Sequence, residues 1–137
     1  MTTLIIWHNI AKDEHGHATA LLAGYREGDR LVPVAAYDVE ARAGAPDLLI
    51  LAEDAYRLFN IGDNPAFGAP DQRAVRYRAA CNRSLSVGDV VQIGAVWLSV
   101  QARGFAHLAE VPTGITLEAG PERGSRPIEM PPGWQPS

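Results

Sequence analysis

The segment DLLILAEDAYRLF, residues 47–59, determines the fold class expected for this chain. Its apolar side chains recur at the i, i+3, i+4, i+7, i+8 and i+11 positions of one helix face. Asp47 can cap the first turn, and Leu49, Ile50 and Leu58 widen the apolar surface beyond a narrow stripe. The spacing therefore predicts an amphipathic helix that lies against a β-sheet.

The segments before this helix predict β-strands. Residues 4–9 form an apolar run, and residues 18–25 follow after a connection that contains glycine, which suggests a hairpin. Residues 31–39 are again β-rich, and Pro33 favours an edge position or a strand start. We expect three N-terminal strands.

The segments after the helix predict a second helix and a hairpin. Pro70 can begin a helix that has Asp71 in its first turn and continues to about Cys81. Residues 90–93 and 96–101 flank the pair Gly94-Ala95, which favours a type II′ hairpin, and residues 105–110 are a further strand candidate. Alternation along the second strand puts Trp97 on the face opposite its apolar neighbours and predicts that it is half exposed.

These elements predict one small α+β domain over residues 1–110. It has N-terminal antiparallel strands, two central helices and a C-terminal β-hairpin or three-stranded meander. Residues 111–137 are rich in proline and glycine and lose the hydrophobic spacing, so we expect a flexible tail. In the alternative, Ile128, Met130 and Trp134 dock on the domain.

Composition excludes several classes of protein. The chain has 137 residues, of which 47% are hydrophobic and 20% charged, and its net charge is −4. No apolar stretch approaches the ~18 residues that span a bilayer, so we expect a cytoplasmic protein without a membrane partner. Cys81 is the only cysteine, which rules out an internal disulfide and predicts a buried apolar side chain. No phosphate-binding, dinucleotide-binding or zinc-protease motif is present, and we expect no cofactor.

Three segments resemble a known family. Residues 56–62 (YRLFNIG), 65–68 (PAFG) and 83–91 (RSLSVGDVV), followed by Gly104-Phe105, are similar to the YodL-like domain. The openings IWHN, residues 6–9, and DEHGH, residues 13–17, look like those of small actinobacterial relatives of unknown function. The resemblance implies an accessory role in a mobile-element context and implies no particular chemistry.

An arginine cluster gives the first candidate site. Arg73, Arg76, Arg78 and Arg83 surround Tyr77 in sequence, with Trp97 further along, and such groups can hold phosphates while an aromatic ring stacks on a base. The alternative is that the arginines solvate a helix face or pair with acids such as Asp71. The acidic net charge of the chain favours this alternative.

Histidines and serines give weaker candidates. His15 and His17 can share a cation if a third ligand is near, although such histidines are more often surface residues. The chain also contains the residue types of a catalytic nucleophile and base, in the pairings of Ser84 or Ser86 with His8 or His107, or of Cys81 with His107. No local sequence signature of catalysis accompanies these residues. The serines and Gly88-Asp89 also suit a turn that leads into a strand.

We therefore expect a non-catalytic binding or accessory module whose partner is a protein. Nucleic-acid binding through the arginine cluster is the alternative, and a small metal-dependent enzyme that uses His15 and His17 is a third hypothesis. The residues proposed for binding are Arg73, Arg76, Arg78, Arg83, Ser84, Ser86, Asp89 and Trp97; no catalytic or metal-binding residue is assigned.

Overall fold

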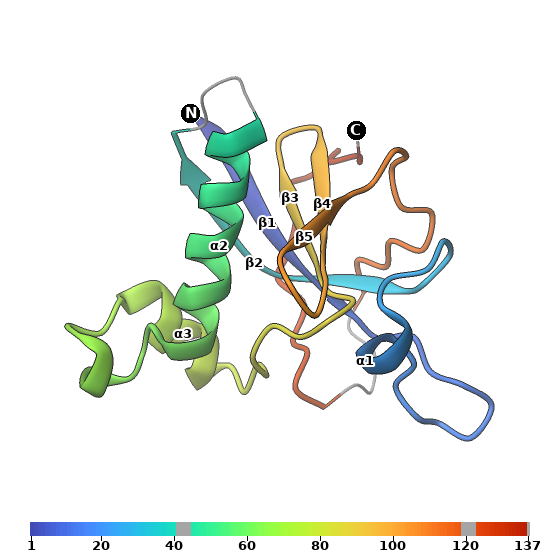
Figure 1. The fold of residues 1–137 in the computed structure, drawn as a ribbon, viewed down its shortest axis with the longest axis horizontal. Helices are drawn as coiled ribbons and strands as arrows, with labels where there is room; N and C mark the ends of the chain where they lie inside the picture. The colour runs from blue at the N-terminus through green and yellow to red at the C-terminus, as the bar shows by residue number, and fades with distance from the viewer. Residues whose placement is uncertain (41–44, 119–122, 137) are drawn as a thin grey trace.

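The protein is an α+β domain built on one antiparallel sheet (Figure 1). The computed structural model describes residues 1–40, 45–118 and 123–136. Its five strands have the order β2-β1-β3-β4-β5. Along the chain the elements are β1 (Thr2–Asn9), α1 (Ala20–Ala23), β2 (Leu31–Val39), α2 (Ala45–Ile61), η1 (Pro65–Phe67), α3 (Gln72–Ala79), β3 (Val90–Ile93), β4 (Val96–Val100) and β5 (Phe105–His107). The predicted fold class is confirmed, including the long helix and a three-stranded C-terminal meander.

β2 forms one edge of the sheet and, among the strands that the structure describes, pairs only with β1. The register pairs Ile6 with Ala35 and Trp7 with Pro33, so Val34 forms a bulge. Pro33 therefore lies where an edge strand tolerates a residue that cannot donate a ladder hydrogen bond. In the turn between β3 and β4, Gly94 has φ of 60°, as the first central residue of a type II′ turn requires.

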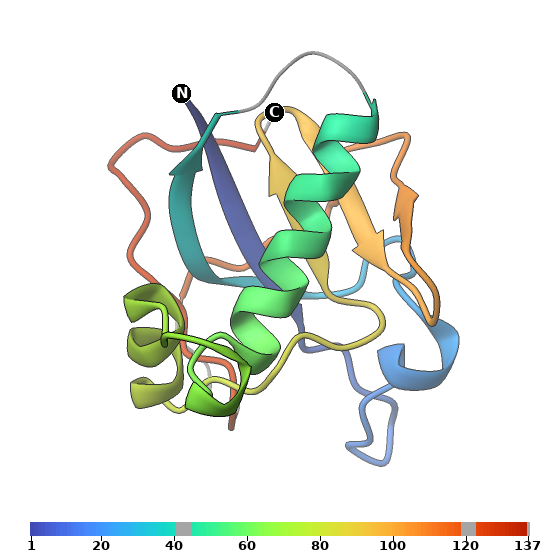
Figure 2. The same cartoon turned by 60° about the vertical axis from the view of Figure 1, so that its left-hand side comes forward.

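The two helices α2 and α3 cover one face of the sheet (Figure 2). Ala52, Ala55 and Phe59 are buried against strand side chains that include Leu4 and Ile6. Tyr56, which the periodicity places on the buried face, is 40% exposed, whereas Leu58 packs against the core. The apolar face of α2 is thus rotated slightly from the one that spacing alone predicts.

The segment after β5 covers the opposite face of the sheet. Trp7 and Trp97 lie on that face, and Trp134 packs against Trp7 with ring centroids 5.5 Å apart. Ile115 and Met130 belong to the same cluster. Trp97 is only 2% exposed, so the expectation that it is half exposed is wrong. Because two tryptophans on an uncovered sheet face would meet water, the contacts of the described part of residues 111–136 favour docking over a free tail.

Two local predictions are corrected. Residues 18–25 do not form a strand: they hold the isolated bridge from Ala18 to Lys12 and then α1, since Ala-Leu-Leu-Ala is composed of strong helix formers. Cys81 is exposed rather than buried, because it lies in the turn after α3 with φ of 66°. Among the helices that the structure describes, none is both long and apolar enough to cross a membrane.

Candidate functional site

Two of the four clustered arginines point inward and hold the backbone together. The Arg78 guanidinium donates to the carbonyl oxygens of Phe59 and Asn60 at the end of α2 and to Asn82 beyond α3. It also donates to the Ser84 hydroxyl. Because carbonyls at a helix C-terminus lack partners within the helix, Arg78 caps α2 and fixes α3 beside it. It is not available as a phosphate ligand.

Arg83 forms a two-pronged ion pair with Asp89, which is fully buried. The two guanidinium nitrogens lie 2.7 and 2.8 Å from the carboxylate oxygens. The same carboxylate accepts from the backbone N–H groups of Asn9 and Ser86, each at 2.8 Å. Burial of the Arg83 guanidinium opposes its charge, but the Asp89 carboxylate outweighs it and raises the pKa of Arg83. This pair neutralises its own charges and ties β1 to the entrance of β3.

The Ser-Val-Gly-Asp segment is a structural turn. The Asp89 N–H donates to the Ser86 carbonyl at 3.0 Å, and Gly88 has φ of 93°. A Cβ atom on Gly88 would lie 2.3 Å from the Cβ of Ala20, so α1 packs directly on this glycine. The bonds that the Asp89 carboxylate accepts and the bond that the Ser84 hydroxyl accepts from Arg78 give both residues a structural role without catalysis.

The aromatic rings of the nucleic-acid hypothesis are also buried. Tyr77 is 4% exposed and its hydroxyl donates to the Arg83 carbonyl, while Trp97 lies beneath the C-terminal segment. A base would need an exposed ring face to stack on. Neither ring offers one.

Arg73 and Arg76 remain at the surface and meet an arginine that is distant in sequence. They line a groove of about 460 Å³ together with Arg126 from the C-terminal segment. The groove runs between α3, residues 126–128 and residues 34–37 of β2, and its described lining contains no carboxylate. We call this surface the arginine groove. The Arg76 and Arg126 guanidinium groups form no hydrogen bond or ion pair with any residue in the described ranges.

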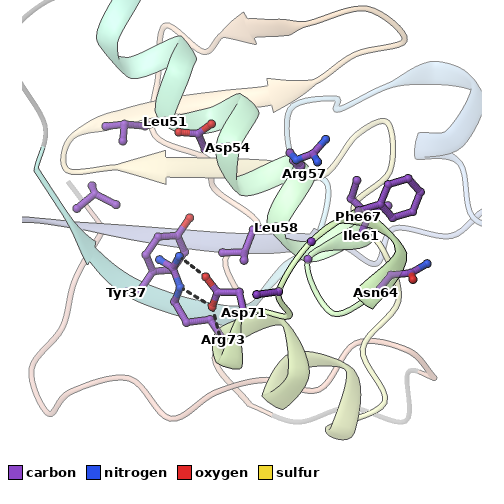
Figure 3. A pocket seen from close by; sticks show the side chains of 14 residues that line it. Tyr37, Leu51, Asp54, Arg57, Leu58, Ile61, Asn64, Phe67, Asp71 and Arg73 are labelled. Atoms are coloured by element: carbon purple, nitrogen blue, oxygen red, sulfur yellow. Dashed lines mark hydrogen bonds and ion pairs between the residues drawn. The ribbon is translucent and has the colours of Figure 1, made fainter.

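Tyr37 and Arg73 line both the arginine groove and a neighbouring pocket, and Figure 3 shows them in that neighbouring pocket. The Arg73 guanidinium carbon lies 4.6 Å from the centre of the Tyr37 ring, and a nitrogen lies 2.7 Å from Asp71. The hydrogen bond from Arg73 holds the pKa of Asp71 below its usual value. Burial raises the pKa of Tyr37 to about 12, so this ring stays neutral.

A neighbouring pocket of about 370 Å³ shares Tyr37 and Arg73 and contains charges of both signs. Figure 3 shows Asp54 and Arg57 on α2 at its upper side and Asp71 below. Its carboxylates would repel an anion. Of the two neighbouring pockets, the arginine groove is therefore the one suited to a negatively charged ligand.

The groove also lies along a free strand edge. On the outer side of β2, the N-terminal part is occupied, since Leu31 exchanges hydrogen bonds with Gly114 and Thr116, and the Pro33 carbonyl accepts from Ile128 at 2.8 Å. For residues 35–39, the described part of the chain provides no backbone partner beyond β1. Alternate residues there leave N–H and C=O groups without a strand partner over about 16 Å, at ~3.3 Å per residue.

A buried histidine connects the C-terminal segment to the sheet. His8 is fully buried, with Nε2 2.6 Å from the Tyr77 hydroxyl and Nδ1 2.8 Å from the Ser125 hydroxyl. Tyr77 gives its single proton to the Arg83 carbonyl, which can only accept. The Tyr77 hydroxyl can therefore accept from Nε2, and the ring also has a hydrogen bond with the Gly124 backbone besides its contact with Ser125.

This pairing of serine and histidine does not favour catalysis. Burial lowers the pKa of His8 to about 4, against the attraction of Asp89. An efficient general base has a pKa near the working pH, and neither His8 nor Ser125 is more than 5% exposed. The arrangement suits a hydrogen-bonded link between β1, α3 and residue 125.

His15 and His17 lie in an exposed turn after β1, where both backbone N–H groups donate to Asp13. Their ring centroids are 6.4 Å apart. In the described ranges, no three histidine, cysteine or acidic side chains are grouped so as to hold a metal ion. His107 is at the end of β5, away from both serines in sequence and exposed.

No family model matches the chain, and neither curated proteins nor solved structures include one with detectable similarity to it. The interpretation of the arginine groove as a functional site therefore rests on the geometry of this structure alone. The sequence identified Arg73 and Arg76 as neighbours, and Pro33 correctly favoured an edge position for β2, but no pattern identified Arg126 as part of the groove. No local pattern relates residue 126 to residue 73, and only the covered tryptophan face indicates that the C-terminal segment returns to the sheet.

Proposed function

We propose that this protein is a non-catalytic binding module that captures an extended acidic segment of a partner protein in the arginine groove. The observation that carries the proposal is the combination of Arg73, Arg76 and Arg126 with an unpaired strand edge and no lining carboxylate among the described residues. An added strand would pair its backbone with residues 35–39 of β2. Its acidic side chains would lie against the arginines.

This geometry supports a polypeptide more strongly than a nucleic acid. A peptide can use the free backbone groups of β2, whereas a nucleic acid cannot. A nucleic acid would gain most from several phosphate contacts and exposed stacking rings, but Arg78 and Arg83 bond internally and Tyr77 and Trp97 are buried. An accessory role in a mobile-element context, which the resemblance to YodL-like domains implies, remains part of this proposal.

The test uses a fluorescent peptide of about eight residues that alternates glutamate and valine, long enough to span the free edge. Its binding is measured by anisotropy at two salt concentrations. We expect saturable binding that Arg76→Glu with Arg126→Glu weakens by about tenfold or more, since each exposed ion pair contributes about 0.5–1 kcal/mol. Arg30→Glu with Arg103→Glu changes the net charge equally at exposed positions outside the groove and serves as the control.

Two further ligands separate the alternatives. A peptide of the same sequence with N-methylated alternate amides cannot form the ladder and should bind more weakly. A single-stranded oligonucleotide of similar length should bind no better than the methylated peptide. If the oligonucleotide binds tightest and its binding falls steeply with salt, the nucleic-acid alternative replaces this proposal.

A further inference from the structure

One nearly buried side chain of the arginine groove has hydrogen-bond donors without a partner. Asn82 lines the groove and is only 5% exposed. Its side-chain oxygen accepts from the backbone N–H of Arg126 at 2.7 Å, but its side-chain nitrogen bonds to no residue in the described ranges. Among those residues, the one unbonded side-chain polar atom shut off from solvent is the Tyr25 hydroxyl, so the Asn82 nitrogen is accessible. This nitrogen can therefore donate to a ligand in the groove.

The bond from Arg126 determines which end of the Asn82 amide is free. Only the amide oxygen can accept a backbone N–H, which leaves the N–H groups of the nitrogen for another partner. The same bond attaches residue 126 to the turn after α3, beside the helix that carries Arg76. Two guanidinium groups and one oriented amide therefore line the same groove.

The groove has two positive charges without a bonded counter-charge. Arg73 is paired with Asp71, which does not line the groove. The pKa of Asp71 is lowered mainly by its hydrogen bond with Arg73, and the charge of Arg76 is the smallest of the causes. Arg76 and Arg126 are both exposed and form no ion pair with a described residue. A ligand group with two negative charges would balance them.

A phosphate monoester matches these donors better than a carboxylate does. The side chain of glutamate has one negative charge and two oxygens, whereas a phosphorylated serine has nearly two charges at neutral pH and three strong acceptor oxygens. The planar guanidinium fork of arginine suits two-pronged contacts with phosphate oxygens. With Arg76 and Arg126 on the phosphoryl group, an oxygen remains that can accept from Asn82.

We propose that the partner segment in the arginine groove has a phosphorylated side chain, whose phosphoryl group is bound by Arg76, Arg126 and Asn82. Phosphorylation of the partner therefore strengthens its capture. This inference rests on the proposed function, because the phosphorylated residue belongs to the same extended segment, and it names the chemical group that the groove recognises.

The test uses three fluorescent peptides of about eight residues in which glutamine alternates with valine, long enough to span the free edge. They differ at one central position, which is serine, glutamate or phosphoserine. Binding to the full chain is measured by anisotropy. We expect the phosphoserine peptide to bind at least about tenfold more tightly than the serine peptide and about threefold more tightly than the glutamate peptide.

Variants of the two exposed arginines test where the phosphoryl group lies. Arg76→Gln and Arg126→Gln should each weaken binding of the phosphoserine peptide about fivefold or more and leave the serine peptide nearly unchanged. Arg103→Gln removes the same charge at an exposed position outside the groove and is the control. These exposed side chains can be changed without disturbing the core.

Asn82→Asp tests the amide itself. The change keeps an oxygen that accepts from the Arg126 backbone and replaces the donor nitrogen with an acceptor. The variant should therefore lose the preference for phosphoserine over glutamate. Because Asn82 is buried, urea unfolding first establishes that the variant is folded, and the arginine variants decide the question if it is not.

Three results would overturn the inference. The first is a phosphoserine peptide that binds no more tightly than the glutamate peptide. The second is a loss of affinity for phosphoserine in Arg76→Gln and Arg126→Gln that is no larger than in Arg103→Gln. The third is tighter binding of a single-stranded oligonucleotide of similar length, because its phosphodiesters then account for the site better than a phosphorylated peptide does.

Failure of this inference is distinguishable from failure of the proposed function. If the peptide of alternating glutamate and valine binds and phosphoserine adds nothing, only the phosphate site is wrong. If the phosphoserine peptide binds as expected but N-methylation of its alternate amides leaves its affinity unchanged, the phosphate site stands and strand addition along β2 is wrong.

Discussion

Asp89→Asn should destabilise the protein strongly, because it leaves Arg83 without its counter-charge. The carboxylate is fully buried and accepts from two guanidinium nitrogens and two backbone N–H groups at 2.7–2.8 Å. Asparagine has nearly the same shape, but its amide nitrogen would face donors and it carries no charge. Breaking a buried pair costs about 3–5 kcal/mol, and we expect the lower end because the Arg83 side chain is 34% exposed.

Urea unfolding measures this loss, with tryptophan fluorescence as the readout. All three tryptophans lie in the cluster on the sheet face opposite α2. At a slope of about 2 kcal/mol per molar urea, a loss of about 3 kcal/mol lowers the midpoint by roughly 1.5 M. Asp38→Asn, at an exposed position of β2, is the control and should change stability by less than about 0.5 kcal/mol.

Restoring charge balance distinguishes the ion pair from a packing effect. The double variant Asp89→Asn with Arg83→Gln should lose less stability than the sum of the two single changes, by about 1–3 kcal/mol. A midpoint shift for Asp89→Asn below about 0.5 M, or strict additivity in the double variant, would refute the assignment of Asp89 as the electrostatic anchor of this turn.

Three other predictions test the packing around the site. Gly88→Ala should cost about 2–3 kcal/mol more than Gly104→Ala, measured by urea unfolding: both glycines have positive φ, but only at position 88 would the new Cβ meet Ala20. Equal losses of stability in the two variants would show that α1 moves to accommodate the new Cβ atom. Trp134→Ala should cost about 1–2 kcal/mol and shift the emission of the remaining tryptophans to longer wavelength, whereas Leu117→Ala, at an exposed position, should do neither. The pKa of His8 is about 4 in the folded protein and 6.5 in the unfolded chain, so the unfolded state binds the proton first as the pH falls. The contribution of His8 to the free energy of unfolding is therefore full above pH 6.5 and decreases by up to ~3 kcal/mol as the pH drops to about 4. The His8→Asn variant should lack this component, and an unchanged pH dependence of its stability would contradict the burial argument.

The sequence predicts the elements of this fold better than its surfaces. Helix α2 and the β3–β4 hairpin follow from local periodicity and from Gly94, because each depends on residues that are adjacent in the chain. The strand predicted over residues 18–25 is wrong because a short apolar run does not distinguish a strand from a helix. The covering of Trp7 by Trp134 is a contact between distant segments, and no local spacing encodes it.

The candidate site shows the same limit. Four arginines that are close in sequence divide into two that bond internally and two that reach the surface, according to which backbone carbonyl or carboxylate each meets after folding. The groove becomes complete only when Arg126 returns beside β2. The sequence indicated the edge position of β2 through Pro33, but the third cation and the placement of the groove along that edge are properties of the tertiary structure.

Amide hydrogen exchange along β2, with and without the alternating glutamate and valine peptide, tests the central claim most directly. The account predicts that alternate amides within residues 35–39 exchange freely in the protein alone and become protected when the peptide is bound, while the Arg76→Glu with Arg126→Glu variant shows little protection at the same peptide concentration. Peptide binding that leaves exchange at residues 35–39 unchanged would contradict strand addition at this edge.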